Sequence, residues 1–186
     1  EVLVRRVGIA GNAVAGDEKL DYTLNYKGAS GSETPSTSTV YFYLSTHNRA
    51  SDALVDSDDA MSASNTYKGD KNTSIYTDKT DLKTRTHFTG IKGEEQADYS
   101  QNFKYDGSVK DTTIYTYAGE ALDYTTTYNL GTEDSKVITG LAKRSYTNFV
   151  GNVKSEEITD YTINYKGASG SETPSTSTVY FYLAAQ

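Results

Sequence analysis

Apolar and polar residues alternate along most of this chain, which is the pattern of short, half-buried β-strands. In residues 20–26 the large side chains fall on one face of an extended strand and the polar ones on the other. The large residues are Leu20, Tyr22, Leu24 and Tyr26. No segment keeps an apolar period of 3.6 residues, so we expect little helix.

A nine-residue phrase recurs in the chain: Glu, two variable residues, Asp-Tyr, Thr or Ser, a variable residue, Asn or Thr, then an aromatic residue. Its copies begin at Glu18, Glu95, Glu120 and Glu157. The first and last copies lie in a longer near-duplicate, since residues 21–44 match residues 160–183 except that Ile163 replaces Leu24. Such repetition indicates a supersecondary unit copied into an array. An enzyme needs one asymmetric pocket, whereas a stalk or fibre is built from repeats.

Each long repeat predicts a strand, a turn at Lys-Gly, a polar connection ASGSETPSTST and a second strand. The second strand is Val40–Leu44 in the first copy and Val179–Leu183 in the last. Further strands are expected at Val2–Ile9, Thr84–Phe88, Thr112–Tyr117, Lys136–Leu141 and Ser145–Val150. Roughly a dozen short strands between turn signals predict an all-β, antiparallel, immunoglobulin-like β-sandwich.

The stretch from Ser51 to Asp81 is polar and has few aliphatic residues. We expect it to be a long surface excursion or an inter-module region, which could contain a strand near Ser74–Tyr76. The division that fits this pattern is two tandem modules, residues 1–90 and 91–186, of which the second could be completed by a neighbouring subunit. One larger sandwich is the alternative.

Charge and composition narrow the function classes. The net charge is -7 and the pI about 4.8, and no basic stripe occurs, so we expect no nucleic-acid partner. No apolar run reaches the length of a membrane span, and the first residues do not have the pattern of a signal peptide. With no cysteine, disulfides and thiolate metal sites are excluded.

Residues 4–54 resemble the CARDB-type and related immunoglobulin-like modules of bacterial and archaeal cell-surface proteins. The matching features are the AGDE opening, the phrase YTLNYKG, and the segment VYFYLS followed by Asp52. The likeness recurs loosely over residues 86–117 and from Phe149 onward, and the acidic, Asn-rich ending of the family is missing. The resemblance implies a β-sandwich with an adhesion or scaffold role outside the cell.

Acidic residues at the strand entrances could bind Ca²⁺, which takes six to eight oxygen ligands. The candidates are Glu18 and Asp21 in the first repeat, and Asp52, Asp56 and Asp58 in the polar stretch. Calcium is therefore an optional ligand, and no other cofactor is expected. The alternative is that these acids solvate an exposed strand start and a turn.

Catalytic chemistry has no supporting motif. His47 and His87 are the only histidines, and they lack the spacing of a metal-binding pair. There is no G-x-S-x-G nucleophile elbow and no phosphate-binding loop. We therefore expect that the protein is not an enzyme.

Exposed aromatic and hydroxyl residues suggest surface contacts. Tyr41, Tyr43, Tyr180 and Tyr182 are predicted on the face opposite the core, where they could stack on sugars or bury against a partner. Cross-strand pairing within the sheet is the alternative. Glycosylation sites are expected at Asn72, in an N-x-S/T sequon, and in the Ser/Thr-rich segment at Thr34, Ser36 and Thr37.

Two functions remain. The first is a non-enzymatic extracellular structural protein, a self-associating subunit of a pilus-like surface fibre or adhesin stalk. It would form a head-to-tail homopolymer by β-strand edge pairing. The edge residues that would mediate this pairing are Val2, Val4, Val7, Ile9, Val179, Phe181 and Leu183. The alternative is a carbohydrate-binding module, with glycans as partners and the tyrosines as platform.

Overall fold

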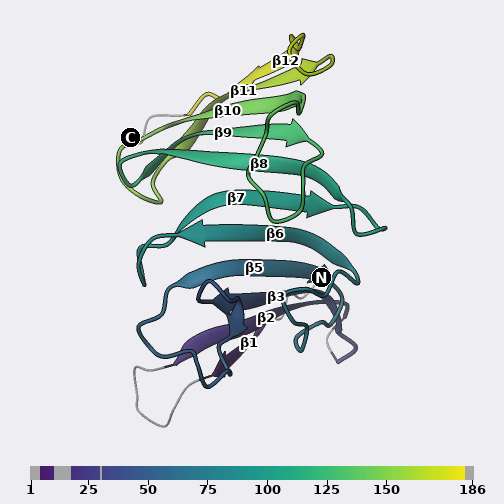
Figure 1. Ribbon diagram of the computed structural model, residues 1–186, viewed down its shortest axis with the longest axis vertical. Coiled ribbons are helices and arrows are strands. Elements are labelled where there is room, and N and C mark those ends of the chain that lie inside the picture. The colour runs from purple at the N-terminus through teal and green to yellow at the C-terminus, as the bar shows by residue number, and fades with distance from the viewer. Residues whose placement is uncertain (1–4, 11–17, 30, 183–186) are drawn as a thin grey trace. The chain divides into compact units, whose positions relative to one another are not determined.

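The structure is a computed structural model that describes residues 5–10, 18–29 and 31–182. Over these residues the protein is all-β: twelve strands and no helix, which confirms the predicted fold class at this level (Figure 1). The strands are β1 (Arg5–Ala10), β2 (Lys19–Lys27), β3 (Thr34–Tyr43), β4 (Asn48–Arg49), β5 (Met61–Lys68), β6 (Leu82–Thr89), β7 (Gln96–Phe103), β8 (Val109–Ala118), β9 (Ala121–Asn129), β10 (Lys143–Val150), β11 (Ile158–Lys166) and β12 (Thr173–Val179).

All twelve strands belong to one antiparallel sheet in which each strand pairs with the next one in sequence, except that β5 pairs with β3 and not with β4. The order is β1-β2-β3-β5-β6-β7-β8-β9-β10-β11-β12, and the short β4 pairs with β3. The sheet does not close on itself, because β1 and β12 are at the two ends of this order. An immunoglobulin-like sandwich needs two sheets, so that assignment stays a prediction.

The chain divides into two compact units. Unit 1 comprises residues 1–97 and 102–108, and unit 2 comprises residues 98–101 and 109–186. The divisions on either side of Asp98–Gln101 fall inside β7. The predicted sandwich modules 1–90 and 91–186 stay a prediction.

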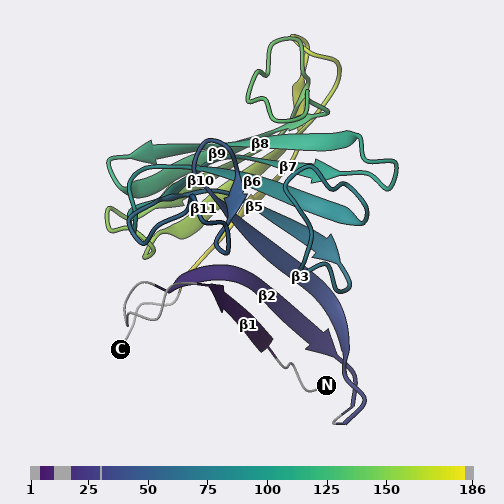
Figure 2. The ribbon, with the colours of Figure 1, turned by 60° about the horizontal axis from the view of Figure 1, so that its bottom comes forward.

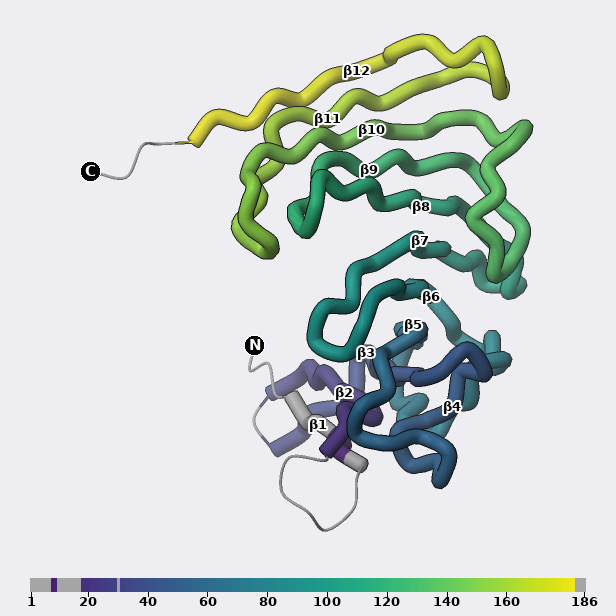
Figure 3. The backbone as a smooth tube through the Cα atoms, turned by 60° about the vertical axis from the view of Figure 1, so that its left-hand side comes forward, coloured from purple at the N-terminus to yellow at the C-terminus, as the bar shows by residue number. Residues whose placement is uncertain are grey.

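Unit 1 has a core on one face of its sheet. The strand β3 buries every second residue, Ser38, Val40 and Phe42, and the paired strand β5 buries Ala63, Asn65 and Tyr67. The strands twist progressively from β6 to β1 (Figure 2). The connections around β4 and after β5 belong to the same unit (Figure 3).

The core of unit 1 contains a buried arginine. Arg85 on β6 is almost fully buried, and its guanidinium lies 4.1 Å from the centre of the Tyr76 ring. Its Nε donates to Asn65 Oδ1 at 2.9 Å, and its Nη2 donates to the carbonyl of Tyr76. Because a buried charge is stable only when it is hydrogen-bonded, these contacts tie the loop around Tyr76 to the sheet.

The segment 51–81 contributes one strand to the unit 1 core, and the residues on either side of that strand are mostly exposed or half-buried. It contains β5, which sequence analysis missed, and Ser74–Tyr76 is not a strand. The core-facing Asn65 explains the miss, because it makes β5 read as polar. Its amide donates to Tyr67 Oη at 2.8 Å and to the Tyr76 carbonyl at 3.0 Å, so a polar residue is satisfied inside.

Unit 2 contains β8 to β12 and the loop 130–142, which crosses in front of β8 and β9 in Figure 1. Gln101 anchors this loop: its Nε2 donates to the Thr132 carbonyl at 2.8 Å, and its Oε1 accepts the Asp134 N–H at 2.9 Å. The predicted strand Lys136–Leu141 is wrong. It lies in this loop, whose first half is held by a side chain instead of a strand ladder.

The two faces of the unit 2 sheet differ in chemistry. One carries tyrosine rings in neighbouring strands, with Tyr124 and Tyr146 centred 5.2 Å apart and Tyr146 and Tyr161 6.1 Å apart. The other carries hydrogen-bonded threonine pairs, such as Thr147 and Thr162 at 3.0 Å. Because side chains of neighbouring strands meet on the same face, these cross-strand pairs stabilise the sheet.

Candidate assembly edge

The near-duplicate sequences fold into the same hairpin. In β2 and β3, Tyr22 pairs with Val40; in β11 and β12, the equivalent Tyr161 pairs with Val179. Both hairpins shift register at the same place, after Asn25 and after its equivalent in the second copy. Both turns also begin at a glycine with positive φ, 130° in the first copy and 115° in the second, a conformation that glycine tolerates best.

Side-chain hydrogen bonds inside the hairpin are duplicated too. The amide of Asn25 donates to Thr37 Oγ1 at 3.1 Å, and its equivalent in the second hairpin does so at 3.0 Å. The hydroxyl of Tyr43 donates to the Leu20 carbonyl at 2.8 Å, and that of Tyr182 to the Thr159 carbonyl at 2.6 Å. The hairpin is therefore specified by its own sequence.

The surroundings of the two hairpins differ. The strand β3 pairs with β5 on its second edge and, beyond the end of β2, with β4 on its first edge, whereas β12 has no strand on its second edge among the described residues. Val40 and Phe42 are 0% exposed, and the equivalent Val179 and Phe181 are 54% and 91% exposed. The apolar side chains that are buried in the first hairpin are therefore exposed to solvent in the second.

The open edge also shortens the strand. The strand β3 continues to Tyr43, while β12 ends at Val179, although the sequences are identical there. The predicted second strand Val179–Leu183 is thus corrected to Thr173–Val179, and that at Val40–Leu44 to Thr34–Tyr43. Phe42 and Tyr43 pair with β4 and β5, so the end of this strand depends on its neighbours.

The predicted self-association residues are distributed as follows. Val2, Val4 and Leu183 lie outside the described residues, and Val7 belongs to β1, the first strand in the sheet order. Ile9 on β1 is exposed, as are Val179 and Phe181 at the β12 end.

The predicted tyrosine row is corrected at Tyr43. This residue is buried, because the register of β3 against β5 shifts between Phe42 and Tyr43 and places Tyr43 opposite Met61. Tyr41 remains partly exposed, and Tyr180 and Tyr182 are exposed. Burial raises the pKa of Tyr43 to about 12, and the nearby Asp21 and Glu95 carboxylates act in the same direction.

Asp21, a calcium candidate, faces a guanidinium. Arg49 on β4 donates from Nε at 2.8 Å and from Nη2 at 2.6 Å to the two Asp21 oxygens, and from Nη1 to the Ser74 carbonyl at 3.0 Å. Sequence analysis missed Arg49. No local motif marks it, since its carboxylate partner is 28 residues away in the sequence.

The other acidic candidates are in turns or exposed positions. Asp52 accepts the Leu54 N–H at 2.9 Å and the Asn48 amide at 2.8 Å, and these bonds lower its pKa. Asp56 accepts the Asp58 N–H at 2.9 Å, and Glu18 is exposed. No group of three or more metal-ligating side chains is found in residues 5–10, 18–29 and 31–182. Calcium binding stays a prediction.

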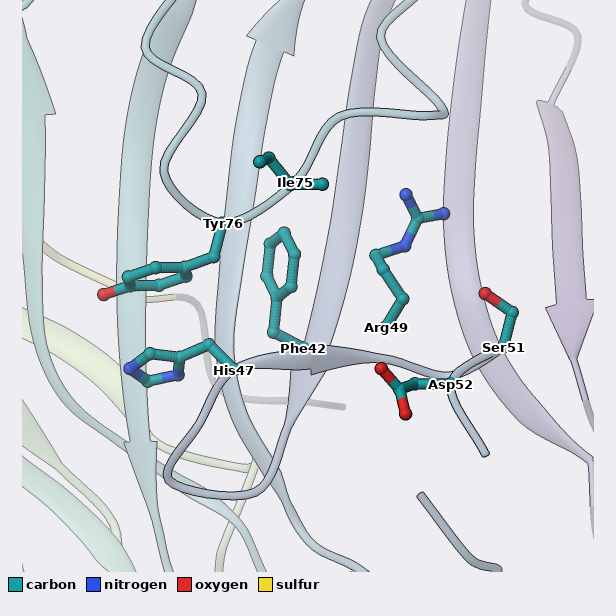
Figure 4. Close-up of a pocket in the computed structure, with 7 residues that line it drawn as sticks. All are labelled: Phe42, His47, Arg49, Ser51, Asp52, Ile75 and Tyr76. Carbon is teal, nitrogen blue, oxygen red and sulfur yellow. The ribbon is translucent and has the colours of Figure 1, made fainter. Parts of the chain in front are cut away.

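A pocket of about 290 Å³ lies beside the Arg49–Asp21 ion pair. It is lined by Phe42, His47, Arg49, Ser51, Asp52, Ile75 and Tyr76 (Figure 4). The His47 ring stacks on Tyr76 with centres 3.9 Å apart, and the Arg85 guanidinium also lies over Tyr76. The Arg49 guanidinium donates to Asp21, and Asp52 accepts from the Asn48 amide. The polar groups of the pocket thus hold the loops of unit 1 together.

The glycosylation candidates lie in a turn and in β3. Asn72 lies in a turn and is partly exposed, and Thr34 is exposed at the start of β3. Ser36 and Thr37 are within β3, not in a loop: Ser36 Oγ donates to the Asn25 carbonyl at 3.0 Å, and Thr37 Oγ1 accepts from Asn25. Residues 34–39 of the predicted polar connection are therefore part of β3, where Ser36 and Thr37 hydroxyls bond across the hairpin.

No family model, curated protein or solved structure matches this chain. Within the described residues, no helix has the length and apolar character needed to cross a membrane.

Proposed function

We propose that this chain is a non-enzymatic extracellular structural protein, a self-associating subunit of a surface fibre or adhesin stalk. The observation that carries the proposal is the open β12 edge. The hairpin that is covered in unit 1 has exposed Val179 and Phe181 in unit 2. Unpaired strand edges with apolar side chains are templates for another strand.

Assembly would proceed by backbone pairing at β12. The Tyr180 N–H donates to the Asp160 carbonyl at 2.9 Å, so Tyr180 faces β11. Since backbone groups alternate sides along an antiparallel strand, Val179 and Ser177 present theirs to the open edge. A contact between β12 and a different edge, such as β1, is heterologous and forms open filaments when the rotation does not close.

The extracellular location and the immunoglobulin-like sandwich rest on the resemblance of residues 4–54 to cell-surface modules. A sandwich would need a second sheet to pack against this one. In an assembly that sheet would come from a neighbouring molecule, and the tyrosine face of unit 2 offers an aromatic surface for it.

Sedimentation velocity over a range of concentrations, with negative-stain microscopy, tests the proposal. We expect the chain to associate and Val179→Pro to stay monomeric, because proline removes the edge N–H and does not fit inside a central strand. Thr176→Ala is the control, since the Thr176 backbone faces β11 as well. A parent chain that is monomeric throughout, or a proline variant that assembles equally well, would refute edge pairing at β12.

Carbohydrate binding is the second candidate, favoured by exposed Tyr180 and Tyr182 beside the open edge. Aromatic rings stack on the apolar faces of sugars, and these two rings are the accessible ones of the predicted row. Glycan-array binding that Tyr182→Ala abolishes would support this function. Binding that survives the change would exclude this platform.

A further inference from the structure

Unit 1 shows which segment covers this hairpin. Residues 45–81 contact β2 and β3 through the β3–β5 ladder and through side chains. One of these contacts is the Arg49–Asp21 ion pair, and another is the edge-on packing of the Tyr76 ring against the Phe42 ring, with centres 5.5 Å apart. Two are hydrogen bonds made by side chains of β5: Ser62 Oγ to the Phe42 carbonyl at 3.3 Å, and the Thr66 hydroxyl to the Thr39 hydroxyl at 3.1 Å. Two more are donated by backbone N–H groups: Gly69 to the Ser36 carbonyl at 3.0 Å, and Lys71 to Ser38 Oγ at 3.0 Å.

Every hairpin residue in these contacts is conserved in the second copy. The equivalents are Asp160, Ser175, Ser177, Thr178 and Phe181. One further contact is lost, since Lys19, which donates to the Asp59 carbonyl, corresponds to Ile158. The second hairpin thus keeps, on β12, every residue through which β3 contacts the 45–81 segment.

We propose that the β11–β12 hairpin is a docking site for a free copy of the 45–81 segment, presented by a partner protein. The partner would add a β5-like strand to the β12 edge, place an arginine on Asp160, and cover Phe181 with an aromatic ring. The proposal rests on the proposed function, because β12 is the pairing edge in both, and it adds the chemistry of the occupant.

Asp160 is the recognition residue in this scheme. Asp21 accepts two hydrogen bonds from Arg49, whereas Asp160 has no ion-pair partner within the described part of the chain. A bidentate guanidinium–carboxylate pair fixes orientation as well as distance, so the arginine would hold the β4 part of the segment against the hairpin. The apolar side chains alone would not specify this placement.

The probe is a labelled synthetic peptide of residues 45–81, titrated into the full chain and followed by fluorescence anisotropy. We expect saturable 1:1 binding that Asp160→Asn weakens about 10- to 100-fold, as expected when one partner of a desolvated charge pair is removed. The peptide carrying R49Q should show a similar loss on the parent chain. Combining the two changes should add little further loss, because they remove the same contact.

The matched control is Asp123→Asn, the same change in another copy of the nine-residue phrase, which should bind the peptide like the parent chain. Peptide binding that Asp160→Asn leaves unchanged, or no binding at all, would overturn the proposal. Loss with Asp21→Asn instead of Asp160→Asn would show strand exchange into unit 1, which also overturns it.

The peptide-binding test and the self-association test can fail independently of each other. If the chain self-associates but does not bind the peptide, edge pairing stands and another occupant, such as β1 of a second copy, fills the edge. If the peptide binds but the chain alone stays monomeric, the docking site stands and the homopolymer does not.

Discussion

The hairpin of β2 and β3 and the hairpin of β11 and β12 have nearly the same sequence in two surroundings. Their turns, register shifts and internal hydrogen bonds agree. Their burial does not: the side chains that form the core of unit 1 are exposed in unit 2. Local sequence thus determines the hairpin, while its burial and the length of its second strand depend on the segment that pairs with it.

Truncating the central aromatic residue should give the largest difference between the copies. Phe42→Ala removes a fully buried ring and should destabilise unit 1 by about 3–5 kcal/mol. The same change at the exposed Phe181 should stay within about 0.5 kcal/mol. Urea unfolding measures both, and hydrogen exchange over residues 19–43 and 158–182 assigns the loss to its unit.

Equal costs at the two positions would contradict the comparison. A large cost at Phe181 in the isolated chain would mean that the ring is already covered in solution. In that case the cost should depend on protein concentration, since a self-associated edge is stabilised by mass action.

Removing the carboxylate should give the next largest difference. Asp21→Asn leaves the Arg49 guanidinium without its anion beside the core and should cost about 1–3 kcal/mol. Asp160→Asn should change stability by less than about 0.5 kcal/mol. The same unfolding and exchange measurements apply, and a substantial cost at Asp160 would show that it already has a partner.

The alternating pattern predicted several of the strands but not what buries them. The strands β2, β6, β8 and β10 contain or overlap segments predicted from Tyr, Thr and Val alternation. The strand β5 was missed because its inward residues include Asn65, whose amide is satisfied only by loop groups that arrive in the tertiary fold. A period-two reading of Ser62, Ser64 and Thr66 against Ala63 and Tyr67 could have found it.

Whether the β12 edge pairs with another chain stays a prediction. The exposure of Val179 and Phe181 could be expected from the duplication, since a second copy of a core strand needs a second cover. The Arg49–Asp21 pair and the buried Arg85 could not be predicted, because each depends on residues brought together by the fold. Tyr43 was misplaced because a register shift moves it to the buried side, and alternation assumes an unbroken strand.

The smallest expected difference concerns one hydroxyl. Tyr43→Phe removes the bond to the Leu20 carbonyl from a buried site and should cost about 1 kcal/mol at neutral pH. Tyr182→Phe removes the equivalent bond at an exposed site and should cost less than about 0.5 kcal/mol. Urea unfolding of both variants and the parent checks this difference.

Alkaline pH should reduce the stability advantage of the parent over Tyr43→Phe. Its pKa is raised from an ordinary 10.0 to about 12, so the folded chain keeps a proton that the unfolded chain loses. The stability that this adds is present below pH 10 and is lost as pH rises from 10 toward 12. Because the chain has 17 tyrosines, the measurement is the parent-minus-variant difference in unfolding free energy against pH. That difference should decline across this interval for Tyr43→Phe, and a flat difference would show that the Tyr43 hydroxyl is solvated in the folded chain.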